Sequence, residues 1–216
     1  MTRGTPGLRE LNKQRTREAI SHAATRLFIE RGFDSVTIAD VAAEVGVAKM
    51  TVTNHFPLKE DLVLDIHEDL ITGPARTVTQ RAPGESALDA LSRACLAALE
   101  RCDPALGFSS PAFAGMITAS PDLSARLREI HEQREEGLAA ALAQETGAAG
   151  DDLTPRLAAV HLDGVHRVVF KGVVRRTLAG ETNDSIAERL AEPTRASFDQ
   201  LRPCLGRYAV RGSTQV

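Results

Sequence analysis

The chain has 216 residues, of which 43% are hydrophobic and 25% charged, a composition typical of a soluble globular protein with one or two domains. No apolar run reaches the ~18 residues that a membrane helix needs, and the N-terminus lacks the apolar region of a secretory signal. Three cysteines are too few for a disulfide framework, so we expect a cytoplasmic protein without a membrane segment.

The net charge of −3 is unevenly distributed along the chain. Residues 1–26 hold six basic and two acidic residues, whereas residues 61–216 hold 17 basic and 22 acidic ones. A basic head on an acidic body suggests that the N-terminal end meets a polyanion. A solvated tail with no binding role explains this composition about equally well.

Helical periodicity runs through the whole chain, and no stretch alternates as a half-buried strand does, so we expect an all-α fold. Residues 1–12 contain two glycines and a proline and are predicted to form a flexible basic tail. The first helix is expected over residues 13–31, with Gly32 at its end. Its apolar face is Ile20, Ala23, Ala24, Leu27 and Phe28.

Residues 37–56 form the most informative segment of the chain. Thr37 and Asp40 match a capping box, which predicts that a helix begins there, and Gly46 ends it after two turns. A third short helix is expected over residues 48–55, because Pro57 stops it. Two short helices joined by a tight turn and preceded by a longer helix indicate a helix-turn-helix motif.

The third short helix is predicted to expose polar side chains that suit the major groove of DNA. An asparagine pairs with an adenine edge, and threonine contacts a phosphate or a thymine methyl group. The polar face of an ordinary bundle helix has the same spacing, so at this point both interpretations stay open. The residues concerned are Lys49, Thr51, Thr53, Asn54 and His55.

The rest of the chain is predicted to be longer helices separated by glycine and proline breakers. We expect residues 59–205 to form a second helical domain and residues 206–216 a flexible tail. The helices are expected over 59–72, with a continuation to 80, and over 85–101, 111–119, 120–144, 154–178 and 183–201.

The middle helices carry more apolar residues than one core face requires, which predicts a cavity for a mostly apolar small molecule. Its few polar groups would be His67, His131 and Arg134, of which His131 or Arg134 would meet an acceptor or acid group of the ligand. A filled core without a cavity explains the same pattern. The expected apolar wall is Leu70, Leu91, Cys95, Phe113, Met116, Ile117 and Leu127.

We find no motif for catalysis, phosphate binding or metal coordination. His161 and His166 are five residues apart, which points them about 140° apart on a helix and suits no shared metal ion. We therefore expect neither an enzyme nor a bound cofactor or metal. The alternative to a DNA-binding protein is an all-helical small-molecule-binding protein or enzyme without DNA activity.

Residues 13–73 resemble the N-terminal domain of the TetR family of transcriptional regulators, on motifs that run in order through four helices. The resemblance implies a DNA-binding domain at residues 13–58, the recognition helix just described, and phosphate contacts from Thr37 and Lys59. The family often has other residues where Ala48, Met50, Thr53 and His55 stand. The matching motifs are Arg17-Glu18-Ala19-Ile20, Leu27-Phe28, Arg31-Gly32-Phe33, Thr37-Ile38-Ala39-Asp40-Val41-Ala42, Gly46-Val47, Lys49, Thr51 and His55-Phe56-Pro57-Leu58-Lys59-Glu60.

The same resemblance implies a homodimeric repressor or activator that binds a double-stranded DNA operator. Of the two we expect a repressor, which a small-molecule effector releases from the operator. The ligand would act through the helix that joins the two domains and change the spacing of the two recognition helices. The last two helices would pair with their copies in the partner. The residues expected in this dimer interface are Leu157, Val165, Val168, Val169, Ile186, Leu190, Phe198 and Leu201.

Overall fold

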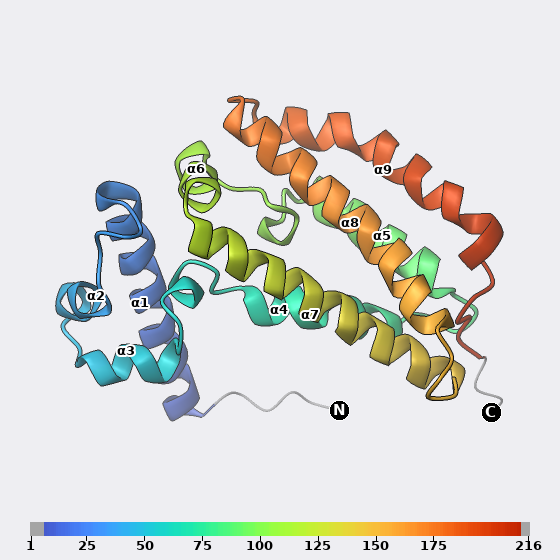
Figure 1. The fold of residues 1–216 in the computed structure, drawn as a ribbon, viewed down its shortest axis with the longest axis horizontal. Helices are drawn as coiled ribbons and strands as arrows, with labels where there is room; N and C mark the ends of the chain where they lie inside the picture. The colour runs from blue at the N-terminus through green and yellow to red at the C-terminus, as the bar shows by residue number, and fades with distance from the viewer. Residues whose placement is uncertain (1–6, 213–216) are drawn as a thin grey trace. The chain divides into compact units, whose positions relative to one another are not determined.

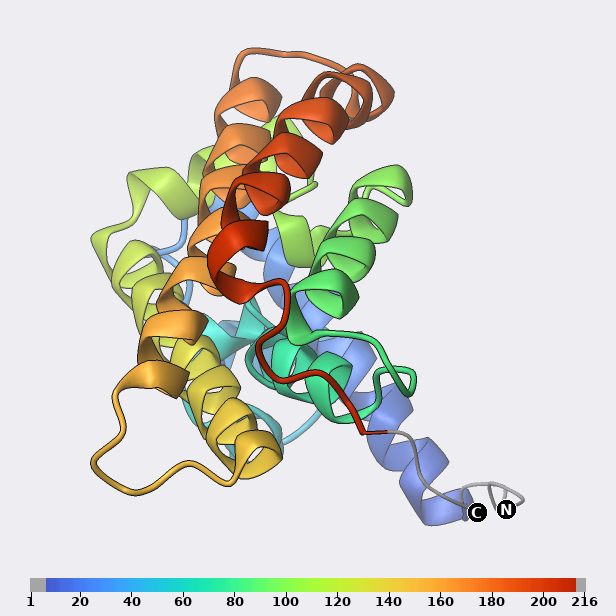
Figure 2. The same cartoon turned by 90° about the vertical axis from the view of Figure 1, so that its right-hand side faces the viewer.

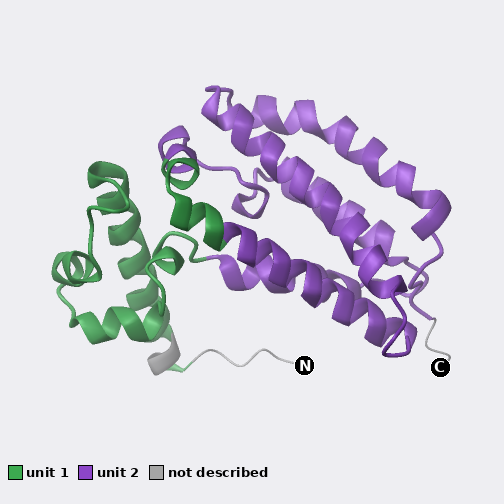
Figure 3. Cartoon of the chain, viewed as in Figure 1, with its two compact units in different colours: residues 1–65, 116–126 green, residues 66–115, 127–216 purple. Residues whose placement is uncertain are grey.

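The computed structural model describes residues 7–212, and the predicted tail segments 1–6 and 213–216 lie outside this range. Within the described range the chain forms nine α-helices and two short 3-10 helices and no β-strand, which confirms the all-α prediction (Figure 1). It divides into two compact units, called unit 1 and unit 2 below (Figure 3). Unit 1 comprises residues 1–65 and 116–126, and unit 2 comprises residues 66–115 and 127–216.

Unit 1 is built on three helices, α1 (Leu8–Arg31), α2 (Ile38–Val45) and α3 (Lys49–His55). Helix α1 begins at Leu8, so residues 8–12 are helical, whereas a tail was expected there. Its predicted apolar face is buried except for the half-buried Ala23. Helix α1 packs on α2, and α2 packs on α3, so the small core of the unit lies between them.

Local chemistry explains why α2 and α3 are short. The Thr37 hydroxyl accepts from the Asp40 N–H at 3.2 Å, and the Asp40 carboxylate accepts from the Thr37 N–H at 2.7 Å, which confirms the capping box. Gly46 ends α2 with a φ of +73°, a left-handed conformation that glycine adopts without strain. The Val47 N–H then bonds the Ala42 carbonyl, and α3 begins two residues later.

The segment after α3 differs from the helix expected over residues 59–72. It forms a 3-10 turn at Glu60–Leu62, and α4 (His67–Thr79) begins five residues later and continues through Pro74. Proline has no N–H and therefore leaves the carbonyl four residues earlier, that of Leu70, without its helical donor. Arg134 Nη1 donates to this carbonyl at 3.0 Å, which explains why the helix tolerates Pro74.

Unit 2 is organised around three of its helices, since α9 packs against both α5 and α8 (Figures 1 and 2). The core between them includes Leu88, Leu99, Val173, Ile186 and Phe198. Helices α6 and α7 each have residues in both units. The bounds of the remaining helices are α5 (Ala87–Glu100), α6 (Pro111–Ala119), α7 (Pro121–Thr146), α8 (Thr154–Leu178) and α9 (Asn183–Leu205), with a second 3-10 turn at Pro104–Leu106.

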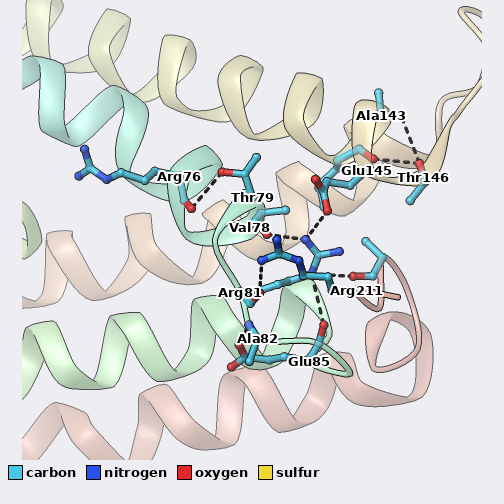
Figure 4. A network of polar contacts seen from close by, with 12 residues as sticks. Arg76, Val78, Thr79, Arg81, Ala82, Glu85, Ala143, Glu145, Thr146 and Arg211 are labelled. Carbon is cyan, nitrogen blue, oxygen red and sulfur yellow. Dashed lines mark hydrogen bonds and ion pairs between the residues drawn. The ribbon is translucent and has the colours of Figure 1, made fainter. Parts of the chain in front are cut away.

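Residues 209–211 are bound back to the loop between α4 and α5, and Figure 4 shows the contacts of Arg211. Arg81 is only 2% exposed, and its guanidinium donates to the carbonyls of Glu85 and Ala209 and pairs with Glu145 at 2.6 Å. Arg211 exchanges backbone hydrogen bonds with Gly84 and Glu85. Residues 209–211 are thus held by defined contacts, although a flexible tail was expected from residue 206.

The boundary of unit 1 lies beyond the expected end of the DNA-binding domain at residue 58. Asp61 is buried and accepts from Arg126 Nε at 2.9 Å, which ties the segment after α3 to the start of α7 within unit 1. Ser21 Oγ donates to the Asp65 carboxylate at 2.6 Å and holds the end of the same segment on α1. No helix in residues 7–212 is long and apolar enough to cross a membrane.

Candidate DNA interface and ligand cavity

One side of α3 consists of the exposed Lys49, Met50 and Asn54 and the half-buried Thr53, which together we call the α3 face. Met50 is 68% exposed, while Val52 on the opposite side is fully buried. These four residues are spaced as one side of a helix requires. Three of them were predicted DNA contacts, and the structure brings them to one surface.

Thr51 and His55 are half-buried and flank the α3 face. The pKa of His55 is lowered, mainly because burial disfavours the charged ring and further because the cations Arg17 and Lys13 lie nearby. The ring is therefore neutral at pH 7 and offers one donor and one acceptor. The Thr53 hydroxyl donates to the Met50 carbonyl at 3.1 Å, so its methyl group is the part left for a base edge.

Arg17 of α1 fixes the C-terminal end of α3. Its Nη1 donates to the His55 carbonyl at 2.7 Å, and its Nη2 donates to the Asp65 carbonyl at 3.3 Å. The guanidinium also stacks on the Phe56 ring, 4.2 Å from its centre. A cation at the carbonyl end of a helix is favourable, so this arginine sets the position of α3 on its support helix.

The two expected phosphate contacts, Thr37 and Lys59, already have partners inside unit 1. Thr37 is engaged in the capping box of α2. Lys59 Nζ donates to the Phe33 carbonyl at 2.7 Å and lies 4.2 Å from the centre of the Phe33 ring. An ammonium has three donors and Lys59 is half-buried, so a phosphate contact by this residue stays a prediction.

Met50 is a member of the α3 face that the sequence analysis did not select. An apolar side chain on the exposed side of a short helix does not contribute to the core. The spacing of the buried residues in the sequence places Met50 on that exposed side. Apolar groups contact the methyl group of thymine in the major groove, and Met50 is placed for such a contact.

Unit 2 contains a cavity of about 440 Å³, a volume suited to a small molecule. Four residues of the predicted ligand set line it, namely Leu70, Leu91, Cys95 and Arg134. Burial raises the pKa of the Cys95 thiol to about 11, so this residue is protonated and acts as a small apolar group. The other predicted residues do not line it: His67, Phe113, Leu127 and His131 belong to unit 2, and Met116 and Ile117 belong to unit 1.

The polar wall of the cavity is built around an ion pair. Arg134 of α7 donates through Nε to Asp163 Oδ1 of α8 at 2.5 Å, and both residues are buried. Arg134 Nη1 donates a hydrogen bond to the Leu70 carbonyl. Arg134 therefore joins α4, α7 and α8, a structural task that the sequence did not reveal.

Two neutral histidines lie beside this ion pair. Burial lowers the pKa of His131 to about 4 and that of His166 well below its usual value, with the positive charge of Arg134 acting in the same direction. The ring centres of His131 and Phe170 are 5.1 Å apart in an edge-on arrangement. Of the two histidines only His166 lines the cavity.

Asp163 and His166 are cavity residues that the sequence analysis missed. Both lie among the buried positions of α8, with Ala159, Leu162 and Val169 before and after them. Polar residues at the helical spacing of an apolar stripe are a readable signal, because buried polar groups need partners. The five-residue spacing of His161 and His166 indicates only that they share no metal ion, and it gives no sign of the cavity.

The predicted dimer residues fall into three groups by their burial. Leu157 and Val168 of α8 are 56% and 72% exposed, and Val160, which was not predicted, is exposed on the same helix. Three members are buried in the core of their own chain: Val169, Ile186 and Phe198. The other three pack against that core and are half-buried: Val165, Leu190 and Leu201.

Comparison with known proteins decides the family of this chain. Residues 20–66 match the family of bacterial regulatory proteins named tetR. The HTH-type transcriptional regulator TcmR of Streptomyces glaucescens is 30% identical over 211 residues, which are 94% of this chain and 91% of that protein. The chain belongs to the TetR family. It is thus a DNA-binding transcriptional regulator with a helix-turn-helix motif, and this family does not consist of enzymes.

Solved structures agree with this TetR-family fold. NalD, the secondary repressor of the MexAB-OprM multidrug efflux pump in Pseudomonas aeruginosa, matches with a TM-score of 0.54 and 22% identity over 85% of this chain and 97% of NalD. A TetR-family regulator of Mesorhizobium loti matches with a TM-score of 0.52 and 22% identity over 88% of this chain and 97% of its own.

Proposed function

We propose that this TetR-family regulator is a homodimeric repressor that leaves its operator when a small molecule occupies the cavity of unit 2. The observation that carries the proposal is the combination of an exposed α3 face in unit 1 with a cavity of about 440 Å³ in unit 2. A binding protein without DNA activity has no use for such an exposed face on a helix-turn-helix.

Each residue of the α3 face has a distinct task in the major groove. The exposed Lys49 ammonium neutralises a phosphate, and the exposed Asn54 amide pairs with an adenine edge. Met50 and the Thr53 methyl group contact thymine methyl groups. Phosphate contacts position the protein, whereas base contacts specify the sequence. Substitution of Lys49 should therefore change the affinity for every duplex, and substitution of Asn54 should change the base preference.

Dimerisation uses an apolar stripe on α8 that consists of Leu157, Val160, Gly164 and Val168. The three large members are exposed, and the spacing of three to four residues places all four on one side of the helix. A two-fold axis brings such a stripe against its own copy, and two copies of the motif then read two half-sites. Ile186 is unsuitable for testing this interface, because it is fully buried in its own chain.

Release from DNA requires a ligand that prefers one arrangement of the dimer over another. Helix α4 is the means of coupling that the chain itself offers. It follows the Glu60–Leu62 segment of unit 1 along the chain, and its Leu70 and Pro74 line the cavity of unit 2. A ligand that displaces α4 changes the spacing of the two recognition helices.

The test of DNA binding is a duplex selected from a random pool by the full-length protein, followed by titrations at several salt concentrations. Lys49→Ala is expected to weaken all duplexes alike and to lower the salt slope by about one. Asn54→Ala is expected to lower discrimination at one base pair by about 1–3 kcal/mol.

The control for both variants is Arg195→Ala, which removes an exposed cation of α9 and leaves α3 unchanged. It should bind DNA as the unaltered protein does. Unchanged binding and unchanged base preference in both the Lys49 and Asn54 variants would exclude the α3 face as the reading surface.

The test of the dimer is sedimentation of the full-length protein at micromolar concentration. We expect a dimer that Val168→Glu converts to a folded monomer, because the partner would bury the new charge without compensation. Ile29→Glu, an equal change at an exposed residue of α1, should leave the dimer intact. A monomeric unaltered protein, or a dimer unaffected by Val168→Glu, would contradict the proposed interface.

A further inference from the structure

Arg17 of α1 forms a bridge between two segments of unit 1 that are ten residues apart in the chain. Its guanidinium donates to the carbonyl of His55, the last residue of α3, and to the carbonyl of Asp65, the residue at which the first stretch of unit 1 ends. An arginine can serve two acceptors at once because its planar guanidinium carries five N–H donors at fixed angles. The position of Asp65 and the position of the end of α3 are thereby linked.

The bridge gives α3 a second support. Among the helices in residues 7–212, α3 packs closely on α2, whereas α1 packs closely on α2 and on the Glu60–Leu62 segment. The Arg17 side chain therefore reaches from α1 to a helix that does not pack closely on it. Without the bridge, the end of α3 would be held by its packing on α2 and by the buried Phe56 ring that follows it.

A second side chain of α1 fixes the far end of the bridge. Ser21 lies four residues after Arg17, and thus on the same side of the helix, and it is buried. Its hydroxyl donates to the Asp65 carboxylate at 2.6 Å. Asp65 is therefore held on α1 by its side chain, while its backbone carbonyl accepts from Arg17.

We infer that Arg17 is a positioning residue for base readout, which sets the angle of α3 through its bridge to Asp65, and that Ser21 fixes the far end of this bridge. The member of the α3 face closest to the bridge along the chain is Asn54, which directly precedes His55. A change in the angle of α3 is costly at this position, because an asparagine recognises adenine by two hydrogen bonds that must form together. The inference rests on the proposed α3 face and assigns part of its sequence preference to residues behind it.

The test measures base discrimination rather than affinity alone. The full-length protein is titrated with the duplex selected from the random pool and with a duplex changed at the base pair whose discrimination Asn54→Ala lowers. The ratio of the two affinities is the readout, called the discrimination ratio. A partly unfolded variant loses affinity for both duplexes by the same factor, so a loss of stability leaves this ratio unchanged.

The first variant is Arg17→Lys, which keeps the positive charge and replaces the planar guanidinium with a single ammonium. We expect the discrimination ratio to fall at least about fivefold, because Asn54 no longer meets its base edge in the right orientation. The salt slope should stay unchanged, since no phosphate contact is lost. Arg195→Lys makes the same change at an exposed arginine of α9 and should leave the ratio as it is.

A double-mutant cycle tests the far end of the bridge. Ser21→Ala should lower the ratio about threefold when Arg17 is present and not at all in the Arg17→Lys background, because both changes act through one bridge. Asp65→Ala removes the same hydrogen bond from its other side and should act as Ser21→Ala does. Asp65→Asn keeps an acceptor for the Ser21 hydroxyl and should retain the ratio. Thr16→Ala, which removes a hydroxyl that bonds the Asn12 carbonyl within α1, is the control.

An unchanged ratio in Arg17→Lys, or equal effects of Ser21→Ala in both backgrounds, would overturn the inference. So would a salt slope lowered by about one in Arg17→Met together with full binding in Arg17→Lys, because Arg17 would then be a phosphate contact. If Asn54→Ala changes no base preference, the proposed α3 face fails and the inference fails with it. A changed preference in Asn54→Ala with an unchanged ratio in Arg17→Lys overturns the inference alone.

Discussion

Each unit contains an arginine that ties its helices together, and the two arginines do so in different ways. In unit 1, the half-exposed Arg17 donates to two backbone carbonyls and stacks on an aromatic ring. In unit 2, the buried Arg134 pairs with the buried carboxylate of Asp163. The Arg17 contacts therefore include no buried carboxylate, whereas the Arg134 contacts include a buried pair of opposite charges whose residues line the cavity.

The difference corresponds to two kinds of ligand. DNA binds at a solvent-exposed surface, where polar side chains form contacts without having been buried in the fold. The proposed small molecule would instead bind inside unit 2, in a cavity of about 440 Å³ lined mostly by apolar side chains. The comparison teaches that exposed polar residues on a short helix suit a DNA surface, whereas the buried ion pair of unit 2 holds helices together from inside.

The largest expected effect comes from removing each arginine in turn. Arg134→Met leaves Asp163 charged and buried and the Leu70 carbonyl without a donor, so we expect a loss of about 3–5 kcal/mol in the free energy of unfolding. Arg17→Met leaves no buried charge behind and should cost about 1–2 kcal/mol. Denaturant unfolding of the full-length protein measures both.

A second variant sharpens this test. The double change Arg134→Met with Asp163→Leu removes both charges and should restore part of the lost stability. Equal losses for Arg134→Met and Arg17→Met would remove the distinction between the two units.

Acid should destabilise unit 2 through its neutral histidines. Burial lowers the pKa of His131 to about 4, from the value of about 6.5 that histidine has in an unfolded chain. Between these pH values the unfolded chain binds more protons than the folded one, so stability is full above pH 6.5 and falls as the pH drops. The part due to His131 is about 2 kcal/mol at pH 5.

Denaturant unfolding at pH 7.5 and pH 5 measures this effect. His131→Phe should reduce the difference between the two pH values, since phenylalanine keeps the edge-on contact with Phe170 and does not titrate. His22→Phe at an exposed residue of α1 is the control and should leave the difference unchanged. The same pH dependence in the His131 variant would contradict the assignment.

The smallest effect is expected at the start of α2 in unit 1. Thr37→Ala removes the hydroxyl that caps the helix and should cost about 1 kcal/mol in unfolding free energy. It should also weaken DNA binding, because α2 supports α3. Ser35→Ala, two residues earlier and exposed, is the matched control. A Thr37 variant as stable as the control would show that the capping box is unimportant.

The helix-turn-helix was predictable because its determinants lie close together in the sequence. Thr37, Asp40 and Gly46 determine the ends of α2 through contacts within a few residues, and Val52 and Phe56 follow the spacing of one buried face. Once the buried positions are known, the remaining side of α3 is the α3 face. Met50 is the one residue of the α3 face that was not predicted as a DNA contact, because the prediction was limited to polar residues.

The cavity was not predictable to the same extent, because its residues come from five helices. Periodicity identifies the apolar side of each helix and not which helix it faces. The expected break after residue 72 does not occur, and the helix runs on as the expected continuation towards residue 80 does. The donor that makes this possible is Arg134, which contacts the Leu70 carbonyl from 64 residues away. The fixed C-terminal segment likewise depends on Arg81 and Ala209, which are 128 residues apart.

The central claim is that the cavity of unit 2 and the α3 face of unit 1 are coupled in one regulator. The most direct measurement is the affinity of the full-length protein for a small apolar probe, chosen by its binding to the DNA-free protein, with and without saturating amounts of the selected operator. We predict that the operator weakens binding of this probe by the same factor by which the probe weakens binding of the operator. Equal probe affinities in the presence and absence of the operator would contradict the account.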